Sequence, residues 1–141
     1  MKENLSLFQM VALHIGRFDL ANMSLTPFNN FQPTHNFIGR TDCKYDHASN
    51  LWRGALGFTY TVKSADSDDV SLTVQASALF TYEAPETADE KARFEKLIRM
   101  NGMVSFLPIL RGRISAASAV LGLPNVNIPS LDLNKFTWDN N

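Results

Sequence analysis

The sequence predicts an α+β fold in which a four-stranded antiparallel sheet is followed by two helices that pack on one of its faces. Strand-like patterns occupy the first part of the chain, and helical signals begin only at Thr87. Two of the strand-like stretches alternate apolar and polar residues with a period of two. No internal repeat interrupts this order, so we expect residues 1–141 to form one domain.

The first predicted strand, residues 5–20, has apolar side chains on both alternation faces. One face would carry Leu7, Val11, Leu13 and Ile15, and the other Phe8, Met10, Ala12 and Phe18. A strand that is apolar on both faces is usually covered on both, and another subunit could supply the second cover. Residues 21–33 are rich in Asn, Ser, Thr and Pro and predict an irregular crossover that buries or presents Phe28 and Phe31.

Three further strands are predicted after the crossover. Residues 37–47 form the weakest of them, with Phe37, Cys43 and Tyr45 as apolar members. Residues 52–62 and 70–82 alternate clearly, so each predicts a strand with one core face and one polar face. The acidic link between them, residues 64–69, predicts a turn, and the two strands should therefore pair as an antiparallel hairpin.

Two helices are predicted in the last third of the chain. Thr87 and Glu90 have the spacing of a capping box, in which each side chain accepts a hydrogen bond from the backbone N–H of the other residue. The helix that starts there should stop at Asn101-Gly102. Pro108 has no amide hydrogen, so it belongs in the first turn of a second helix that ends near Leu121.

The second helix is rich in small residues, which allow another helix to approach closely within one subunit or between two. Together with the first strand, which is apolar on both faces, this predicts a symmetric oligomer. The predicted interface consists of Leu7, Val11, Leu13, Ile15, Gly112, Ser115, Ala116 and Ala119.

Composition excludes several classes of partner. The net charge is -1 and the Lys and Arg residues do not cluster, so we expect no binding to nucleic acid. No run approaches the ~20 apolar residues that cross a bilayer, so we expect no membrane insertion. The single cysteine, Cys43, excludes an intrachain disulfide, and the N-terminus lacks the pattern of a signal peptide. A cytoplasmic protein is therefore expected.

Catalytic and metal sites are not expected either. Four titratable residues lie close together in the sequence: Asp42, Cys43, Asp46 and His47. On an extended strand the cysteine and the histidine would project from the face opposite the two aspartates. The acidic residues Asp66, Asp68 and Asp69 lack the glycine and the distant glutamate of an EF-hand loop. The sequence thus predicts no enzyme, no cofactor and no metal.

Residues 97–136 carry features that resemble the SecB protein-export chaperones. These features are the proline-first helix Leu107-Pro108-Ile109-Leu110-Arg111, the run from Ser115 to Val120, and the tail that passes through Leu123-Pro124 and Ile128-Pro129 to Leu133-Asn134-Lys135-Phe136. Phe31-Gln32-Pro33 also looks like the aromatic-Gln-Pro of the SecB crossover loop. Leu79-Phe80-Thr81-Tyr82 looks like the end of the fourth SecB strand.

The resemblance implies a homotetramer, built as a dimer of dimers, whose subunits hold non-native polypeptide in a hydrophobic groove. By this similarity the groove would be lined by Phe28, Phe31, Phe37, Ile128, Leu131 and Phe136, and we place Leu133 of the tail with them. The implied function is that of an ATP-independent holdase for unfolded or precursor polypeptides, with a role in protein export.

The chain departs from the SecB pattern where that family docks to the SecA translocase motor. SecB members that hand clients to SecA offer acidic residues on the exposed sheet face and at the end of the first strand. Here the comparable sheet positions read Leu72-Thr73-Val74-Gln75, and Met23 stands where a second acid is expected, so only Asp19 remains. Docking to a SecA-type motor is therefore in doubt.

Two alternatives to a general holdase stay open. One is a dedicated adaptor or chaperone for a single partner, such as a toxin–antitoxin component. The other, which we rank last, is an enzyme or small-ligand protein that uses the same groove.

Overall fold

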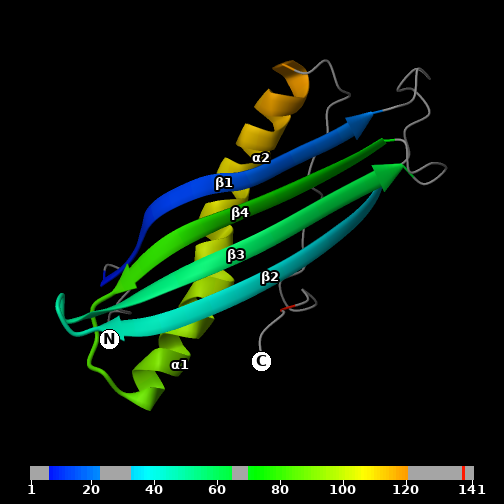
Figure 1. Cartoon of the computed structure of the whole chain (residues 1–141). Helices are drawn as coiled ribbons and strands as arrows, with labels where there is room; N and C mark the ends of the chain where they lie inside the picture. Colours follow the sequence, from blue (N-terminus) through cyan, green and yellow to red (C-terminus); the bar gives the residue numbers. More distant parts are fainter. Residues whose placement is uncertain (1–6, 23–32, 65–69, 121–137, 139–141) are drawn as a thin grey trace.

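The computed structural model describes residues 7–22, 33–64, 70–120 and 138. Its elements are β1 (Phe8–Asn22), β2 (Pro33–Asp46), β3 (Leu51–Ser64), β4 (Val70–Tyr82), α1 (Ala88–Leu97), the π-helical turn η3 (Ile98–Gly102) and α2 (Met103–Val120). The strands form one antiparallel sheet in the order β1-β4-β3-β2. The helices cross one face of this sheet diagonally, from the β2 side to the β1 side (Figure 1). The predicted α+β fold, with its helices on one face of a four-stranded antiparallel sheet, is confirmed.

The core lies between the helices and the two central strands. Every second residue of β3 and β4 points toward the helices and is buried, as the alternation predicts. These residues are Trp52, Leu56, Phe58, Tyr60, Val62, Leu72, Val74, Ala76, Ala78, Phe80 and Tyr82. The helices contribute Phe94, Ile98, Phe106, Leu110 and Ile114, all fully buried. The predicted antiparallel pairing of the two central strands is confirmed, and the turn at 65–69 lies outside the described residues.

Strand β1 does not have the two apolar faces that the alternation predicts. Its pairing with β4 shifts register between Met10 and Ala12 and again between Ile15 and Arg17. Each extra residue reverses which face the following side chains take, because directly paired residues share one face. Leu13 and Ile15 are therefore opposite buried alanines of β4 and on the helix side, together with Phe8, Met10 and Phe18. The predicted division of this strand into two faces is wrong.

The helices form one continuous rod, so the predicted stop at Asn101-Gly102 and the predicted new start at Pro108 are both wrong. Gly102 is buried inside the rod, where an added Cβ would lie 3.0 Å from Cζ of Phe80. The glycine thus allows close packing on β4 and does not end a helix. Pro108 lies inside α2 and removes one hydrogen bond to the carbonyl of Val104, a residue that is exposed to water.

A second glycine brings the rod close to β3. A Cβ on Gly54 would lie 2.6 Å from Cδ1 of Ile98 and 2.8 Å from the Phe94 ring. A side chain larger than hydrogen fits there only if the Phe94 and Ile98 side chains, or the helix that carries them, shift. The distance between helix and sheet is therefore set by glycines on both elements.

The start of α1 forms only half of the predicted capping box. The Glu90 backbone N–H donates to the Thr87 hydroxyl at 3.1 Å, as predicted. The Glu90 carboxylate instead accepts hydrogen bonds from the Tyr82 hydroxyl at 2.7 Å and from Arg93 at 3.1 Å. The Thr87 N–H donates to the carbonyl of Pro85 at 2.9 Å. Glu90 thus fastens the first turn of α1 to the end of β4.

None of the helices described above is both long enough and apolar enough to cross a bilayer.

Candidate functional site

Strand β2 is one of the two outer strands of the sheet, so its helix-facing side chains lie at the border between the core and the solvent. We call this side the β2 row, which consists of His35, Phe37, Gly39, Thr41, Cys43 and Tyr45. Each member is paired with a buried residue of β3. The three central members are buried, whereas His35, Phe37 and Tyr45 are half-buried. Within the described parts of the chain, no strand of the sheet pairs with the outer edge of β2, where Trp138 forms an isolated bridge with Gly39.

The residues of the β2 row nearest the start of the strand, His35 and Phe37, form an aromatic stack with Tyr60 of β3. Phe37 lies on Tyr60 with ring centroids 4.9 Å apart and 20° between the planes, and it also stacks with His35 at 6.2 Å. His35 Nδ1 and the Tyr60 hydroxyl form a hydrogen bond. Burial lowers the pKa of His35 and raises the pKa of Tyr60 to about 12, so both are uncharged at neutral pH. The stack therefore offers flat, uncharged aromatic surface at the edge of the sheet.

The middle of the β2 row meets a cation and a second aromatic residue. Arg99 of η3 donates from Nη2 to the Thr41 hydroxyl at 3.4 Å. Its Cζ lies 5.0 Å from the centre of the Trp138 ring. The backbone of Trp138 forms a parallel bridge with Gly39. Residues from β2, from the helical rod and from the end of the chain thus come together here.

Cys43 of the β2 row is not a reactive thiol. Burial, followed by the negative charges of Glu95 and Asp42, raises the pKa of Cys43 to about 12. Asp42 itself is exposed on the opposite side of the strand, as the sequence predicts. Among the described residues, no three His, Cys, Asp or Glu side chains are close enough to share a metal ion. The arrangement therefore favours packing and binding over thiol chemistry.

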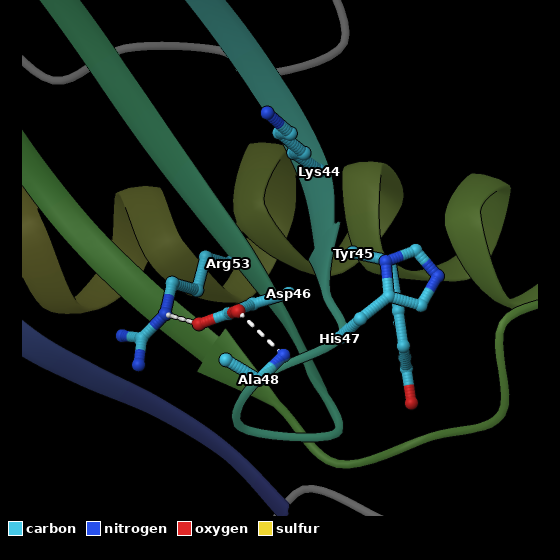
Figure 2. A pocket seen from close by; sticks show the side chains of 6 residues that line it. All are labelled: Lys44, Tyr45, Asp46, His47, Ala48 and Arg53. Atoms are coloured by element: carbon cyan, nitrogen blue, oxygen red, sulfur yellow. Dashed lines mark hydrogen bonds and ion pairs between the residues drawn. The ribbon is translucent and has the colours of Figure 1, made fainter.

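A pocket of about 380 Å³ lies at the turn between β2 and β3 (Figure 2). It is lined by Lys44, Tyr45, Asp46, His47, Ala48 and Arg53. Asp46 accepts hydrogen bonds from Arg53 Nε at 2.7 Å, from the Ser49 hydroxyl at 2.9 Å and from the Ala48 N–H at 3.0 Å. The Arg53 and Ser49 bonds, in that order, are the main reasons why the pKa of Asp46 is lowered to about 2.

An aspartate with such a low pKa stays ionised and cannot exchange protons near neutral pH. His47, which also lines the pocket, is exposed, and its Nε2 lies 2.8 Å from Oε1 of Glu86. This contact links the turn to the segment between β4 and α1. The polar groups of this pocket therefore hold the turn in place, and we do not assign a catalytic role to them.

The structure places the predicted groove residues unevenly. Phe37 lies half-buried in the β2 row, and its part in a groove stays a prediction. The other six predicted groove residues lie outside the described part of the chain: Phe28, Phe31, Ile128, Leu131, Leu133 and Phe136. Sequence reasoning missed Thr41, Arg99 and Trp138. The one available signal was Trp138 itself, a large aromatic residue in an otherwise polar end of the chain.

The predicted interface residues divide into two groups. Leu7, Leu13 and Ile15 are half-buried and pack against the chain's own core, and Ser115 is also half-buried. Val11 and three residues of α2, Gly112, Ala116 and Ala119, are exposed. The interface itself stays a prediction.

The outward side of α2 is apolar. Val104 is 66% exposed and Val120 86% exposed, and Arg111 and Arg113 are the only charged residues within the helix. Arg113 donates to the Leu13 carbonyl at 3.3 Å, which ties α2 to β1. A helix side that faces water is normally rich in charged residues. The outward side of α2 is therefore better suited to a protein contact than to solvent.

Comparison of the structure with solved structures identifies the fold. A SecB-like chaperone from Mycobacterium tuberculosis, solved in complex with a ChAD peptide from the HigA1 antitoxin, matches with a TM-score of 0.68 and 16% identity. The match covers 92% of this chain and 91% of that one. A protein of unknown function from Streptococcus agalactiae matches with a TM-score of 0.55 and 12% identity, over 87% of this chain and 97% of that one.

No protein-family model and no curated protein matches the sequence. The chain thus has the SecB-like fold that its sequence features predict, with a highly divergent sequence.

Proposed function

We propose that this chain is an ATP-independent chaperone that holds unfolded segments of other polypeptides against the β2 row. The observation that carries the proposal is the half-buried aromatic stack of His35 and Phe37 on the outer strand of the sheet. Aromatic faces can cover apolar side chains of many shapes, and the outer edge of β2, to which Trp138 already bridges at Gly39, can pair with the backbone of an extended chain. Both features favour broad binding of unfolded polypeptide.

The SecB-like fold supports this proposal, because the chaperone from Mycobacterium tuberculosis with the same fold was solved with a peptide bound. Each 100 Å² of buried apolar surface yields about 2.5 kcal/mol. Association costs at least about 4 kcal/mol, so several contacts along the row must act together. We propose that Phe28, Phe31, Ile128, Leu131, Leu133 and Phe136 extend the binding surface beyond the β2 row.

We also propose that the chain assembles into a cytoplasmic homotetramer, a dimer of dimers. The support is the apolar outward side of α2, where Gly112, Ala116 and Ala119 would let a second copy approach closely. Val11 of β1, which is 54% exposed, would lie at the edge of the same contact.

A dedicated chaperone for one partner is the second candidate function. Two observations favour it over protein export. The peptide in the chaperone from Mycobacterium tuberculosis comes from an antitoxin. On the outer sheet face of this chain, Asp19 forms an ion pair with Arg17, and the neighbouring positions Thr73 and Gln75 are neutral. Such a face has little negative charge with which to attract a SecA-type motor.

Suppression of aggregation by the intact protein tests the chaperone proposal. A chemically unfolded test protein should stay in solution when this chain is present at equal molar amounts. Phe37→Ser should require several-fold more protein for the same protection, because it removes an aromatic face from the β2 row. Ile38→Ser is the matched control, because Ile38 is the next residue of β2 and points to the opposite face.

Equal protection by both variants, with unchanged circular dichroism, would show that the β2 row is not the binding surface. Aggregation that proceeds unchanged with the intact protein would exclude a holdase. Affinity capture from a lysate separates the two candidate functions, because one stoichiometric partner indicates a dedicated chaperone and many partners indicate a general one.

A further inference from the structure

Trp138 is held against the β2 row by contacts of two different kinds. Its backbone forms the parallel bridge with Gly39, and its ring lies 5.0 Å from the Arg99 guanidinium carbon. The side chain is half-buried and packs against the hydrophobic core. A residue near the end of the chain therefore adds to the outer strand in the way that an extended peptide would.

Arg99 has few hydrogen-bond acceptors among the described residues. Within that part of the chain its buried Nε has no hydrogen-bond partner, and Nη2 donates to the Thr41 hydroxyl at a long 3.4 Å. None of the ion pairs found in the described part of the chain includes Arg99. A guanidinium that is partly removed from water is attracted to the face of an aromatic ring, most strongly to tryptophan. The face of an aromatic ring, such as the Trp138 ring at 5.0 Å, is thus a favourable partner for Arg99 here.

The β2 row carries no side chain at the position to which Trp138 bridges. Gly39 has no side chain and lies between Phe37 and Thr41 on the helix-facing side of the strand. A ligand that bridges to Gly39 can therefore direct a side chain toward Arg99 without displacing a residue of β2. The bridge is parallel, so the ligand backbone runs in the same direction as β2.

We propose that Gly39, Thr41 and Arg99 form a subsite for an aromatic side chain of an extended bound polypeptide, and that Trp138 occupies this subsite in the absence of a client. This inference rests on the proposed polypeptide-binding function. One subsite cannot hold two rings, so a client with an aromatic residue must displace Trp138. Since Trp138 belongs to the same chain, it competes at a high effective concentration. The unloaded chaperone thereby covers the most polar part of its own binding surface, and aromatic clients are selected over aliphatic ones.

Two peptides test the inference by isothermal titration calorimetry with the full chain. Both are uncharged, unstructured and composed of Ser, Thr and Val, and they differ only in a central Phe or Leu. Trp138→Ala should bind the Phe peptide about tenfold more tightly than the wild type does, which corresponds to about 1.4 kcal/mol. The Leu peptide should gain less than threefold. Trp138→Phe, which keeps a ring in the subsite, should stay near the wild-type affinity.

Arg99→Gln in the Trp138→Ala background keeps a hydrogen-bonding group and removes the cation. It should abolish the preference for the Phe peptide over the Leu peptide. A second readout needs no variant: saturating Phe peptide should shift the tryptophan emission of the wild type to longer wavelength as Trp138 moves into water. Trp52, the other tryptophan, is buried and donates a hydrogen bond to the Pro85 carbonyl at 3.1 Å, so its emission should not change.

The outcomes separate this inference from the proposed function. If wild type and Trp138→Ala bind both peptides equally well and the emission does not shift, the subsite is wrong and the chaperone proposal stands. If neither protein binds either peptide, the proposed function is overturned, and this inference with it.

Discussion

Replacement of Gly54 by alanine tests whether the glycines set the distance between helix and sheet. A methyl group at this position would lie 2.6 Å from Cδ1 of Ile98 and 2.8 Å from two atoms of the Phe94 ring. Ordinary contacts between carbon atoms are about 3.5–4.0 Å. Phe94 and Ile98 are both fully buried, so neither side chain can turn into solvent to relieve the overlap.

The expected cost is therefore that of an overpacked core, about 1–3 kcal/mol. Urea unfolding followed by circular dichroism measures it, at one fixed protein concentration because any assembly stabilises the folded chain. Gly57→Ala is the matched control. Gly57 lies three residues further along β3 and faces away from the helices, and there the nearest atoms to an added Cβ are at 3.8 Å. It should unfold at the wild-type urea concentration or slightly above, because alanine suits a strand interior better than glycine does.

A double variant with Ile98→Val identifies the source of the cost. Valine lacks the Cδ1 atom that lies closest to the added methyl group, so Gly54→Ala combined with Ile98→Val should be more stable than the sum of the two single losses predicts. Equal urea midpoints for Gly54→Ala and Gly57→Ala would refute the close helix–sheet contact. The same result would also contradict the position of Arg99 beside Thr41, because Arg99 directly follows Ile98 in η3 and is placed by the same helix–sheet contact.

Three further predictions concern charge, thiol reactivity and assembly. Folding lowers the pKa of Asp46 to about 2, so the ionised carboxylate stabilises the fold at any pH above its unfolded pKa of about 4. This stabilisation is lost as the pH falls from about 4 toward 2. Between these pH values the free energy of unfolding of Asp46→Asn should therefore decrease less than that of the wild type. Cys43, buried and with its pKa raised to about 12, should react with a disulfide reagent such as DTNB only after unfolding, and rapid reaction of the native protein would contradict its position in the core. Ala116→Glu on the outward side of α2 should reduce the particle mass measured by light scattering, whereas Lys96→Glu on exposed α1 should not; an unchanged mass would place the interface elsewhere.

Strands β3 and β4 show how much a regular pattern predicts. The residues at every second position from Trp52 to Val62 and from Leu72 to Tyr82 are apolar apart from Gly54, and all of them are buried on the helix side, whereas Leu79 on the opposite face is 47% exposed. Strand β1 has an equally apolar sequence, yet its faces were predicted wrongly. The register shifts near Val11 and Gly16 arise from the pairing with β4. The sequence of a strand does not by itself indicate at which residue such a β-bulge occurs.

The helical region shows the same limit. Gly102 and Pro108 are common signals of helix ends, and local preference alone predicts two helices. The packing of Gly102 on Phe80 outweighs the local tendency of glycine to end a helix. Because this glycine allows the helix to approach the sheet closely, the apolar side chains along the whole rod can be buried. The sequence therefore predicted which residues are helical better than it predicted where helices begin and end.

For the candidate site, Phe37 was within reach of sequence reasoning, because it is an aromatic residue on a predicted strand. Arg99 and Thr41 were not, since they are separated by 58 positions and meet only through the packing of η3 on β2. Trp138 comes to the same place from the end of the chain through its bridge to Gly39.

The sequence by itself determined the order of strands and helices, the core faces of β3 and β4 and the absence of a recognisable catalytic motif, because these depend on residues that are neighbours along the chain. Only the tertiary structure decided which face each β1 residue takes, that the helices form one rod, and that a cation, a glycine and a tryptophan meet at the edge of β2. Each of these depends on contacts between distant residues, whose energies appear only when the chain is packed.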